Sequence, residues 1–164
     1  MATELNNLSS YDPDSIPNGK GKRIGIVVSD WNRNITGSLL KGAYKTLVKF
    51  GVDTEDIIIE HVPGSFELTF GAKILIEKTN VDGVIILGCV IQGETPHFTF
   101  VCESVTDGTT RLNLENEVPV IFGLLTTNTQ EQAIARSGGR DGNKGDEAAI
   151  TALKMIELNE KYNK

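Results

Sequence analysis

The sequence predicts an α/β domain in which a mainly parallel sheet is covered by helices on both faces. Four short runs rich in branched apolar residues are separated by longer segments with helical spacing. The apolar runs carry few charges, which is typical of strands that are buried on both faces of a sheet. Strands that alternate with helices form parallel sheets, because a parallel connection needs a long crossover.

The first half of the chain predicts two strand–helix units. Residues 23–28 are an apolar run and predict the first strand. The helix after it is predicted from apolar residues at every fourth position, namely Ile35, Leu39, Ala43 and Leu47. Gly51 suits the end of that helix. Residues 56–62 predict the second strand, and a second helix is expected over 66–78, with Ser65 as its cap.

The second half predicts two more strands and three helices. Residues 84–90 form the clearest strand, because they are β-rich and carry no charge. A long helix is expected from Phe98 to about Glu117, and residues 118–125 predict the fourth strand. Asn128 and Glu131 have the spacing of a capping box, which predicts a short helix that ends at Gly138. A glycine-rich loop over 138–145 then precedes a final helix built on Ala149, Ile150, Leu153 and Ile156.

Residues 1–20 predict an irregular tail or extended arm ahead of a single domain, residues 21–164. Polar and turn-forming residues cluster in this segment, and four apolar residues are spaced along it: Leu5, Leu8, Tyr11 and Ile16. Such spacing suits an arm that adds to the sheet edge of a neighbouring subunit.

Composition excludes several classes of protein. The chain has 164 residues and a net charge of -6, which argues against a nucleic-acid partner. It has no apolar run long enough for a membrane span and no apolar signal core in its first twenty residues, so we expect a cytoplasmic protein with no membrane contact. Cys89 and Cys102 form no metal-binding or disulfide pattern, and with two histidines in the chain we expect no metal site. Both thiols are interpreted as small buried hydrophobes.

Open parallel sheets bind ligands at the carboxyl ends of their strands, so the loops after the strands hold the candidate site. Trp31 is the only tryptophan and suits stacking on a planar ring, with partial core packing as the alternative. Residues 93–95 open a helix, whose amides suit an anion, although an ordinary helix start fits as well. His97 can move protons near neutral pH or be structural. Arg136 and Lys144 flank the glycine-rich loop and are solvated charges unless an anion lies near them.

Five motifs resemble those of lumazine synthases. They are VPGSFE at 62–67, LGCVIQGETPH at 87–97, VIFG at 120–123, EQAIAR at 131–136 and GNKG at 142–145. They occur in order between Lys22 and Leu158. The resemblance implies a flavodoxin-like three-layer sandwich with a mainly parallel four-stranded sheet. It also implies a transferase that condenses 5-amino-6-(ribitylamino)pyrimidinedione with 3,4-dihydroxy-2-butanone 4-phosphate. The product would be 6,7-dimethyl-8-ribityllumazine, in the penultimate step of riboflavin biosynthesis, with no cofactor.

The same resemblance implies residues for the two parts of the pyrimidine substrate. Those implied to hold the heterocycle are Trp31, Asn32, Cys89, Val90 and Ile91. Those implied to take the ribityl chain are Ser65, Phe66 and Glu67. Lumazine synthases more often have phenylalanine at the position of Trp31, and tryptophan offers a larger π-face.

The resemblance assigns the remaining candidates to phosphate binding, proton transfer and the subunit interface. The implied phosphate ligands are the backbone amides of Glu94 and Thr95 and the guanidinium of Arg136, with Lys144 neutralising nearby charge. His97 would shuttle protons, and Phe122 would pack on the ring from a neighbouring subunit. Gln92 and Arg140 depart from the usual family pattern and receive no role.

Partners follow from the same resemblance. It implies a homo-oligomer of five subunits, or of sixty in an icosahedral shell, acting on small molecules. It extends to riboflavin binding and to a riboflavin synthase partner. Two alternatives stay open. One is a related five-subunit riboflavin synthase of the archaeal kind, and the other is a non-catalytic flavin-binding or shell-forming protein.

Overall fold

The structure is a computed structural model that describes residues 11–163. Its centre is a four-stranded sheet in which every neighbouring pair is parallel, in the order β2-β1-β3-β4. The strands are β1 (Ile24–Ser29), β2 (Ile57–Val62), β3 (Gly83–Ile91) and β4 (Val120–Thr127). This order, with β1 and β3 adjacent in the middle, is that of flavodoxin-like proteins. The predicted α/β fold is therefore confirmed.

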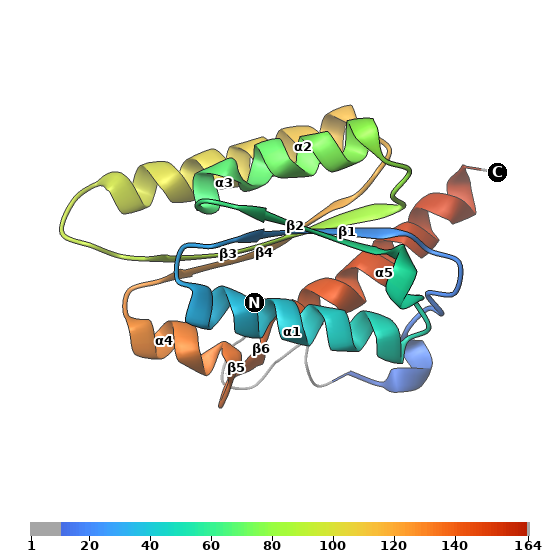
Figure 1. Cartoon of the computed structure of the whole chain (residues 1–164), viewed down its shortest axis with the longest axis horizontal. Helices are drawn as coiled ribbons and strands as arrows, with labels where there is room; N and C mark the ends of the chain where they lie inside the picture. Colours follow the sequence, from blue (N-terminus) through green and yellow to red (C-terminus); the bar gives the residue numbers. More distant parts are fainter. Residues whose placement is uncertain (1–10, 164) are drawn as a thin grey trace.

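Helices cover both faces of the sheet and complete three layers (Figure 1). On one face lie α2 (Leu68–Lys78) and α3 (His97–Glu115), and on the other lie α1 (Arg33–Lys49) and α5 (Lys144–Tyr162). The short α4 (Gln130–Ala135) follows β4 on the same side as α1. Single 3-10 turns are η1 (Pro13–Ser15), η2 (Thr54–Asp56) and η3 (Ser65–Glu67).

Strand β1 shows how the apolar runs create two cores. All six of its residues are buried. Because successive side chains of a strand point to opposite faces, Ile26 and Val28 pack with α1 and α5, whereas Val27 packs with α2. The predicted apolar face of α1 is buried as expected. Each fully buried aliphatic side chain contributes about 1.5–3 kcal/mol, so the strand ends that carry the loops belong to a rigid layer.

The structure shifts two predicted helix starts. Ser65 opens the turn η3 instead of capping α2, and its hydroxyl has no hydrogen-bond partner among the described residues. The cap of α4 is Thr129 rather than Asn128, because Thr129 Oγ1 accepts from Gln132 N at 3.3 Å while Gln132 Oε1 accepts from Asn128 N at 2.9 Å. The cap therefore lies one residue later than predicted, and the Gln132 side chain returns to the residue before the cap rather than to the cap itself.

The predicted glycine-rich loop contains a small antiparallel ribbon. Its strands are β5 (Ser137–Gly139) and β6 (Gly142–Asn143), so α4 ends before the predicted Gly138. Gly138 and Gly142 have φ values of +111° and +84°. Only glycine adopts this region readily, so the glycines that indicated a loop are those that allow the ribbon to turn.

The described part of the predicted arm lies against its own subunit. Ile16 is buried in the core beneath α1, and the Tyr11 ring packs edge-on against Phe50 with centroids 5.7 Å apart. Gly19 N also donates to Phe50 O at 2.7 Å. Tyr11 and Ile16 thus contribute to this chain's own core, and Leu5 and Leu8 lie outside the described residues.

Candidate active site

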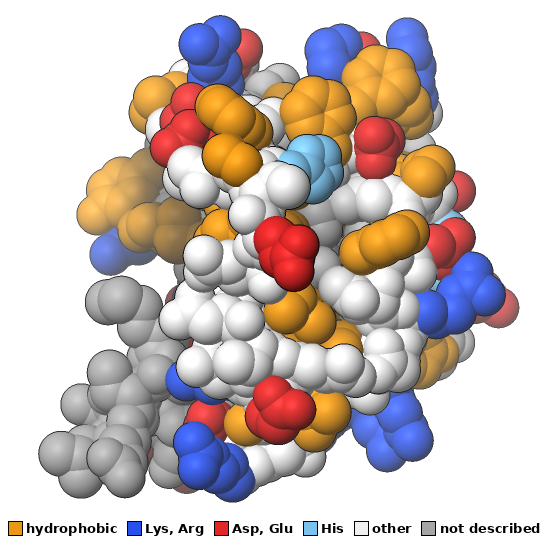
Figure 2. Space-filling view, turned by 90° about the vertical axis from the view of Figure 1, so that its left-hand side faces the viewer, with side chains coloured by type: hydrophobic (Ala, Val, Ile, Leu, Met, Phe, Trp, Pro, Cys, Tyr) orange, Lys and Arg blue, Asp and Glu red, His pale blue; other side chains and the backbone are white. Residues whose placement is uncertain are grey.

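A cleft of about 610 Å³ lies where the loops after β1, β2 and β3 meet. The connections from β1 and β3 leave toward opposite faces of the sheet, through α1 and α3, and such a switch point is the usual ligand site of this architecture. Figure 2 faces this end of the molecule and shows hydrophobic side chains and a histidine around a hollow. The position of the predicted site at the strand ends thus corresponds to a real cleft.

Most predicted site residues line this cleft together. They are Trp31, Asn32, Ser65, Phe66, Glu67, Cys89, Val90, Ile91, Thr95 and His97. Phe98 and Val101, for which no site role was predicted, also line it from the first turns of α3. Their spacing from each other was a signal, because residues three apart on a helix share a face.

Two aromatic side chains stand open at the cleft. Trp31 is 71% exposed and Phe66 is 57% exposed. The backbone around Trp31 is fixed, because Asp30 N donates to Val62 O at 2.8 Å and Trp31 N donates to Pro63 O at 3.2 Å. The exposed Trp31 ring is therefore carried by a backbone that is fixed against the end of β2, and such a ring can stack on a planar ligand.

Asn32 ties the β1 loop to the end of β3. It has left-handed backbone angles, φ 58° and ψ 45°, a region that asparagine tolerates better than most residues. Its Nδ2 donates to Cys89 O at 3.0 Å. One of the two N–H groups of Asn32 Nδ2 is used in this bond, so its second N–H and its Oδ1 are the polar groups left for a ligand at this position.

Asp30, the residue before Trp31, belongs to an ionic cluster with Arg33 and His61. Asp30 Oδ1 accepts from Arg33 Nη2 at 2.8 Å and lies 2.9 Å from His61 Nδ1. Hydrogen bonds from Arg33 first and His61 second lower the pKa of the Asp30 carboxyl below its ordinary value. The carboxylate is thus ionised and links the ends of β1 and β2 beside the cleft.

The two cysteines differ in their surroundings. Cys89 is buried, and burial raises the pKa of its thiol to about 11. It is therefore neutral and inert near neutral pH. Cys102 is only partly buried, so the prediction of two buried thiols holds for Cys89 alone. Burial, and then the negative charge of Glu103, raise the pKa of the Cys102 thiol as well.

His97 lies at the rim of the cleft as the first residue of α3, and its side chain is exposed. Next to it, Gly93 and Thr95 line the cleft, whereas the exposed Glu94 between them does not. Ser65 lies deeper, where its buried hydroxyl has no described partner. The cleft thus combines an aromatic wall, polar groups and an imidazole able to carry a proton.

The other three predicted residues are not brought to this cleft within one chain. Phe122 and Lys144 line a separate groove of about 310 Å³ along β4, between α3 and α5. Strand β4 is at the edge of the sheet, so this groove follows an unpaired strand edge. Within it, Lys144 Nζ donates to the buried Glu147 carboxylate at 2.9 Å.

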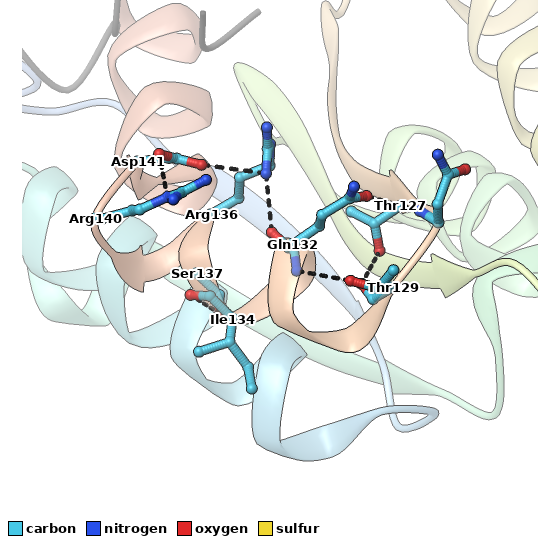
Figure 3. A network of polar contacts seen from close by, with 9 residues as sticks. Thr127, Thr129, Gln132, Ile134, Arg136, Ser137, Arg140 and Asp141 are labelled. Carbon is cyan, nitrogen blue, oxygen red and sulfur yellow. Dashed lines mark hydrogen bonds and ion pairs between the residues drawn. The ribbon is translucent and has the colours of Figure 1, made fainter. Parts of the chain in front are cut away.

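Arg136 follows α4 directly and is anchored by polar contacts (Figure 3). Its Nη1 donates to Gln132 O at 3.1 Å and lies 3.2 Å from Asp141 Oδ2. Arg140, to which the sequence analysis assigned no role, lies 3.2 Å from the other oxygen of the same carboxylate. Gln92 is exposed before α3, and its backbone N donates to Thr127 O at 2.8 Å.

Residues 11–163 contain no cluster of three or more His, Cys, Asp or Glu side chains that could hold a metal ion. None of the described helices is long and apolar enough to cross a membrane.

Fold and cleft together define a flavodoxin-like α/β protein with an open cleft at the switch point of its sheet, the place where proteins of this architecture bind small molecules. The sequence profile of the family described as 6,7-dimethyl-8-ribityllumazine synthase matches residues 21–160. The chain belongs to that family, and it is a condensing enzyme of riboflavin biosynthesis.

Curated relatives of the same name agree over nearly the whole chain. The protein of Phocaeicola vulgatus is 56% identical over 100% of this chain and 98% of its own length. That of Parabacteroides distasonis is 58% identical over 96% of this chain and 99% of its own length. That of Porphyromonas gingivalis is 56% identical, over 96% and 98% respectively. These names favour lumazine formation over the related riboflavin synthase reaction.

Proposed function

We propose that this chain condenses 5-amino-6-(ribitylamino)pyrimidinedione with 3,4-dihydroxy-2-butanone 4-phosphate in the cleft at the ends of β1, β2 and β3. The observation that carries the proposal is the meeting of two open aromatic rings, Trp31 and Phe66, with the exposed imidazole of His97 in one cleft. A flat substrate needs the rings, and imine formation and phosphate elimination need a proton carrier.

The cleft supports a division of roles for the pyrimidine substrate. Trp31 stacks on the heterocycle, and the polar backbone from Cys89 to Ile91 faces its edge. The ribityl chain lies along Ser65 to Glu67, where the unpartnered Ser65 hydroxyl and the half-buried Glu67 carboxylate bind its hydroxyl groups. A buried hydroxyl without a partner gains most from a ligand that supplies one.

The main task of the protein in this reaction is to orient the two substrates. One substrate brings an amine and the other a carbonyl, so holding both in reacting geometry lowers the barrier by about 7–11 kcal/mol. His97 then moves protons at the rim of the cleft, which contributes about 10²- to 10⁴-fold. No residue role in this scheme requires a metal ion or a nucleotide.

Phosphate binding is proposed to use a second subunit. The amides of Glu94 and Thr95 precede α3 on one side of the site, whereas Arg136, Lys144 and Phe122 lie elsewhere in the same chain. Copies arranged head to tail would place the groove along β4 of one subunit against the cleft of the next. Head-to-tail contacts form a ring when the rotation between copies closes, and we propose a closed ring of five subunits, alone or as sixty in a shell.

We also propose that the same aromatic wall binds riboflavin, which has a flat ring. Contact with a riboflavin synthase is a further part of the proposal. The cytoplasm is the proposed location, as for a metabolic enzyme.

The test mixes both substrates with the purified protein, in the presence of a chelator, and follows the fluorescence of the lumazine product. We expect product to form without added metal or nucleotide. His97→Ala should lose about 10²- to 10⁴-fold in kcat, while His61→Ala, which removes the histidine bound to Asp30, should retain turnover. Absence of product with the native protein would leave the non-catalytic flavin-binding alternative.

A further inference from the structure

Asp141 lies between two guanidinium groups. Its Oδ2 is 3.2 Å from Arg136 Nη1, and its Oδ1 accepts from Arg140 Nε at 3.2 Å (Figure 3). The side chains of Arg136 and Asp141 are 33% and 24% exposed, whereas that of Arg140 is 83% exposed. The inner pair is thus shielded from solvent on most sides, and the outer arginine joins it from the surface.

The backbone fixes this carboxylate relative to Arg136. Asp141 N donates to Ala135 O at 2.9 Å, and Lys144 N donates to Arg136 O at 2.9 Å. The ribbon between them packs closely on the end of α4, since a Cβ atom on Gly139 would lie 2.8 Å from Ala135 Cα. The distance between Asp141 and Arg136 is therefore set by hydrogen-bonded backbone rather than by a free loop.

The contacts of Arg136 leave one side of its guanidinium open. Both Gln132 O and the Asp141 carboxylate engage Nη1, so Nε and Nη2 are available, among the described residues, to a further acceptor. A guanidinium binds phosphate through two parallel N–H groups on one edge. Arg136 is thus held from one side in a way that presents a two-donor edge on the other.

We propose that Asp141 is a positioning residue, which holds Arg136 in the orientation that receives the phosphate of the second substrate. This inference rests on the proposed function of Arg136. Arginine has many rotamers, and fixing one before the ligand arrives lowers the entropy lost on binding. Arg140 offsets the charge of the carboxylate, so two guanidiniums and one carboxylate leave a net positive charge for the anion.

An alternative role for Asp141 predicts the opposite effect of its removal on phosphate binding. A carboxylate that merely repels the phosphate would improve phosphate binding when it is removed. If the carboxylate instead positions Arg136, its removal weakens phosphate binding, because the acceptor is lost. Asparagine keeps an acceptor and should restore phosphate binding. The two substitutions Asp141→Ala and Asp141→Asn therefore separate the interpretations.

The experiment measures kinetics with each substrate varied in turn, inhibition by inorganic phosphate, and thermal unfolding. For Asp141→Ala we expect kcat/KM for the butanone phosphate to fall about tenfold or more, as misplaced groups do, with weaker phosphate inhibition. KM for the pyrimidine should not change, and Asp141→Asn should recover most of the loss.

Arg136→Ala distinguishes failure of the inference from failure of the proposed function. If it leaves use of the butanone phosphate unchanged, Arg136 holds no phosphate, and both ideas are refuted. If it impairs that use while Asp141→Ala leaves it unchanged or improves it, only the positioning role is refuted. Equal losses for both substrates in Asp141→Ala, with a lower unfolding temperature, would make Asp141 a structural residue and refute positioning.

Discussion

Replacement of Trp31 by alanine tests the aromatic wall of the cleft directly. Its side chain is 71% exposed, so little of the folded core depends on it. Substitutions at such surface positions usually change stability by about 0.5 kcal/mol or less. The main-chain bond from Trp31 N to Pro63 O does not involve the side chain. We therefore expect Trp31→Ala to fold normally and to lose ligand affinity.

The size of the loss follows from the open area of the ring. Large aromatic side chains present about 150–250 Å², so at 71% exposure roughly 110–180 Å² of Trp31 is open to a ligand. A ring that covers half of this area gains about 1.3–2.2 kcal/mol at about 25 cal/mol per Å². Stacking adds about 0.5–1.5 kcal/mol. The total of about 1.8–3.7 kcal/mol corresponds to a loss of roughly 20- to 500-fold in affinity.

Fluorescence provides the assay. Trp31 is the only tryptophan, so quenching of intrinsic emission by a lumazine or by riboflavin reports on this one site. Affinity of the variants is measured from the ligand's own fluorescence, because Trp31→Ala has no tryptophan signal. Trp31→Phe is the matched control and should stay within about tenfold of the native protein, since it keeps a stacking face. Unchanged affinity in Trp31→Ala, or a loss as large in Trp31→Phe, would refute the stacking argument.

Three further predictions concern charge, pH and assembly. Arg136→Ala should weaken use of the butanone phosphate by about 1.5–3 kcal/mol, the value of a charge-assisted hydrogen bond, while binding of a pyrimidine analogue, measured by calorimetry, stays unchanged. The Cys89 thiol has a pKa raised from 9.0 to about 11 in the folded protein, so its contribution to stability is complete below pH 9 and is lost between about pH 9 and 11. The unfolding temperature across that window should fall more steeply in the native protein than in Cys89→Ala, and parallel curves would contradict this contribution of Cys89. Analytical ultracentrifugation should show five subunits or a multiple of five, and a monomer that turns over would contradict the shared site.

The sheet, its helices and the position of the cleft were predictable because they depend on periodicity. Buried strands without charge and an apolar residue at every fourth position of α1 leave few arrangements, and a parallel sheet then fixes where a ligand binds. The α4 cap was misplaced by one residue because Asn128, Thr129 and Gln132 offer overlapping capping patterns. The choice between them depends on backbone angles that the sequence does not show.

The contacts of Arg136 could not be predicted for a different reason. Glycine-rich segments lack the side-chain pattern that sets strand register, so the ribbon that brings Asp141 to Arg136 was interpreted as a loop. Arg140 consequently had no assigned partner. Phe98 and Val101 were missed because the face that a helix presents to a cleft depends on how the helix packs.

The charges near the cleft argue that turnover depends on assembly. In a single subunit the residues at the proposed phosphate position are Gly93, Glu94 and Thr95. Among residues 11–163, the lining of the cleft includes the carboxylate of Glu67 but no lysine or arginine. Backbone amides alone are a weak match for a doubly charged phosphate beside carboxylates, since each like charge adds repulsion. The cations assigned to the phosphate, Arg136 and Lys144, lie outside that cleft. A neighbouring subunit that supplies them would make phosphate use fall as the oligomer dissociates, while the aromatic wall of each separate subunit still binds a flavin weakly. Dilution or interface mutations should therefore abolish turnover before they abolish ring binding, and the reverse order would refute the shared site.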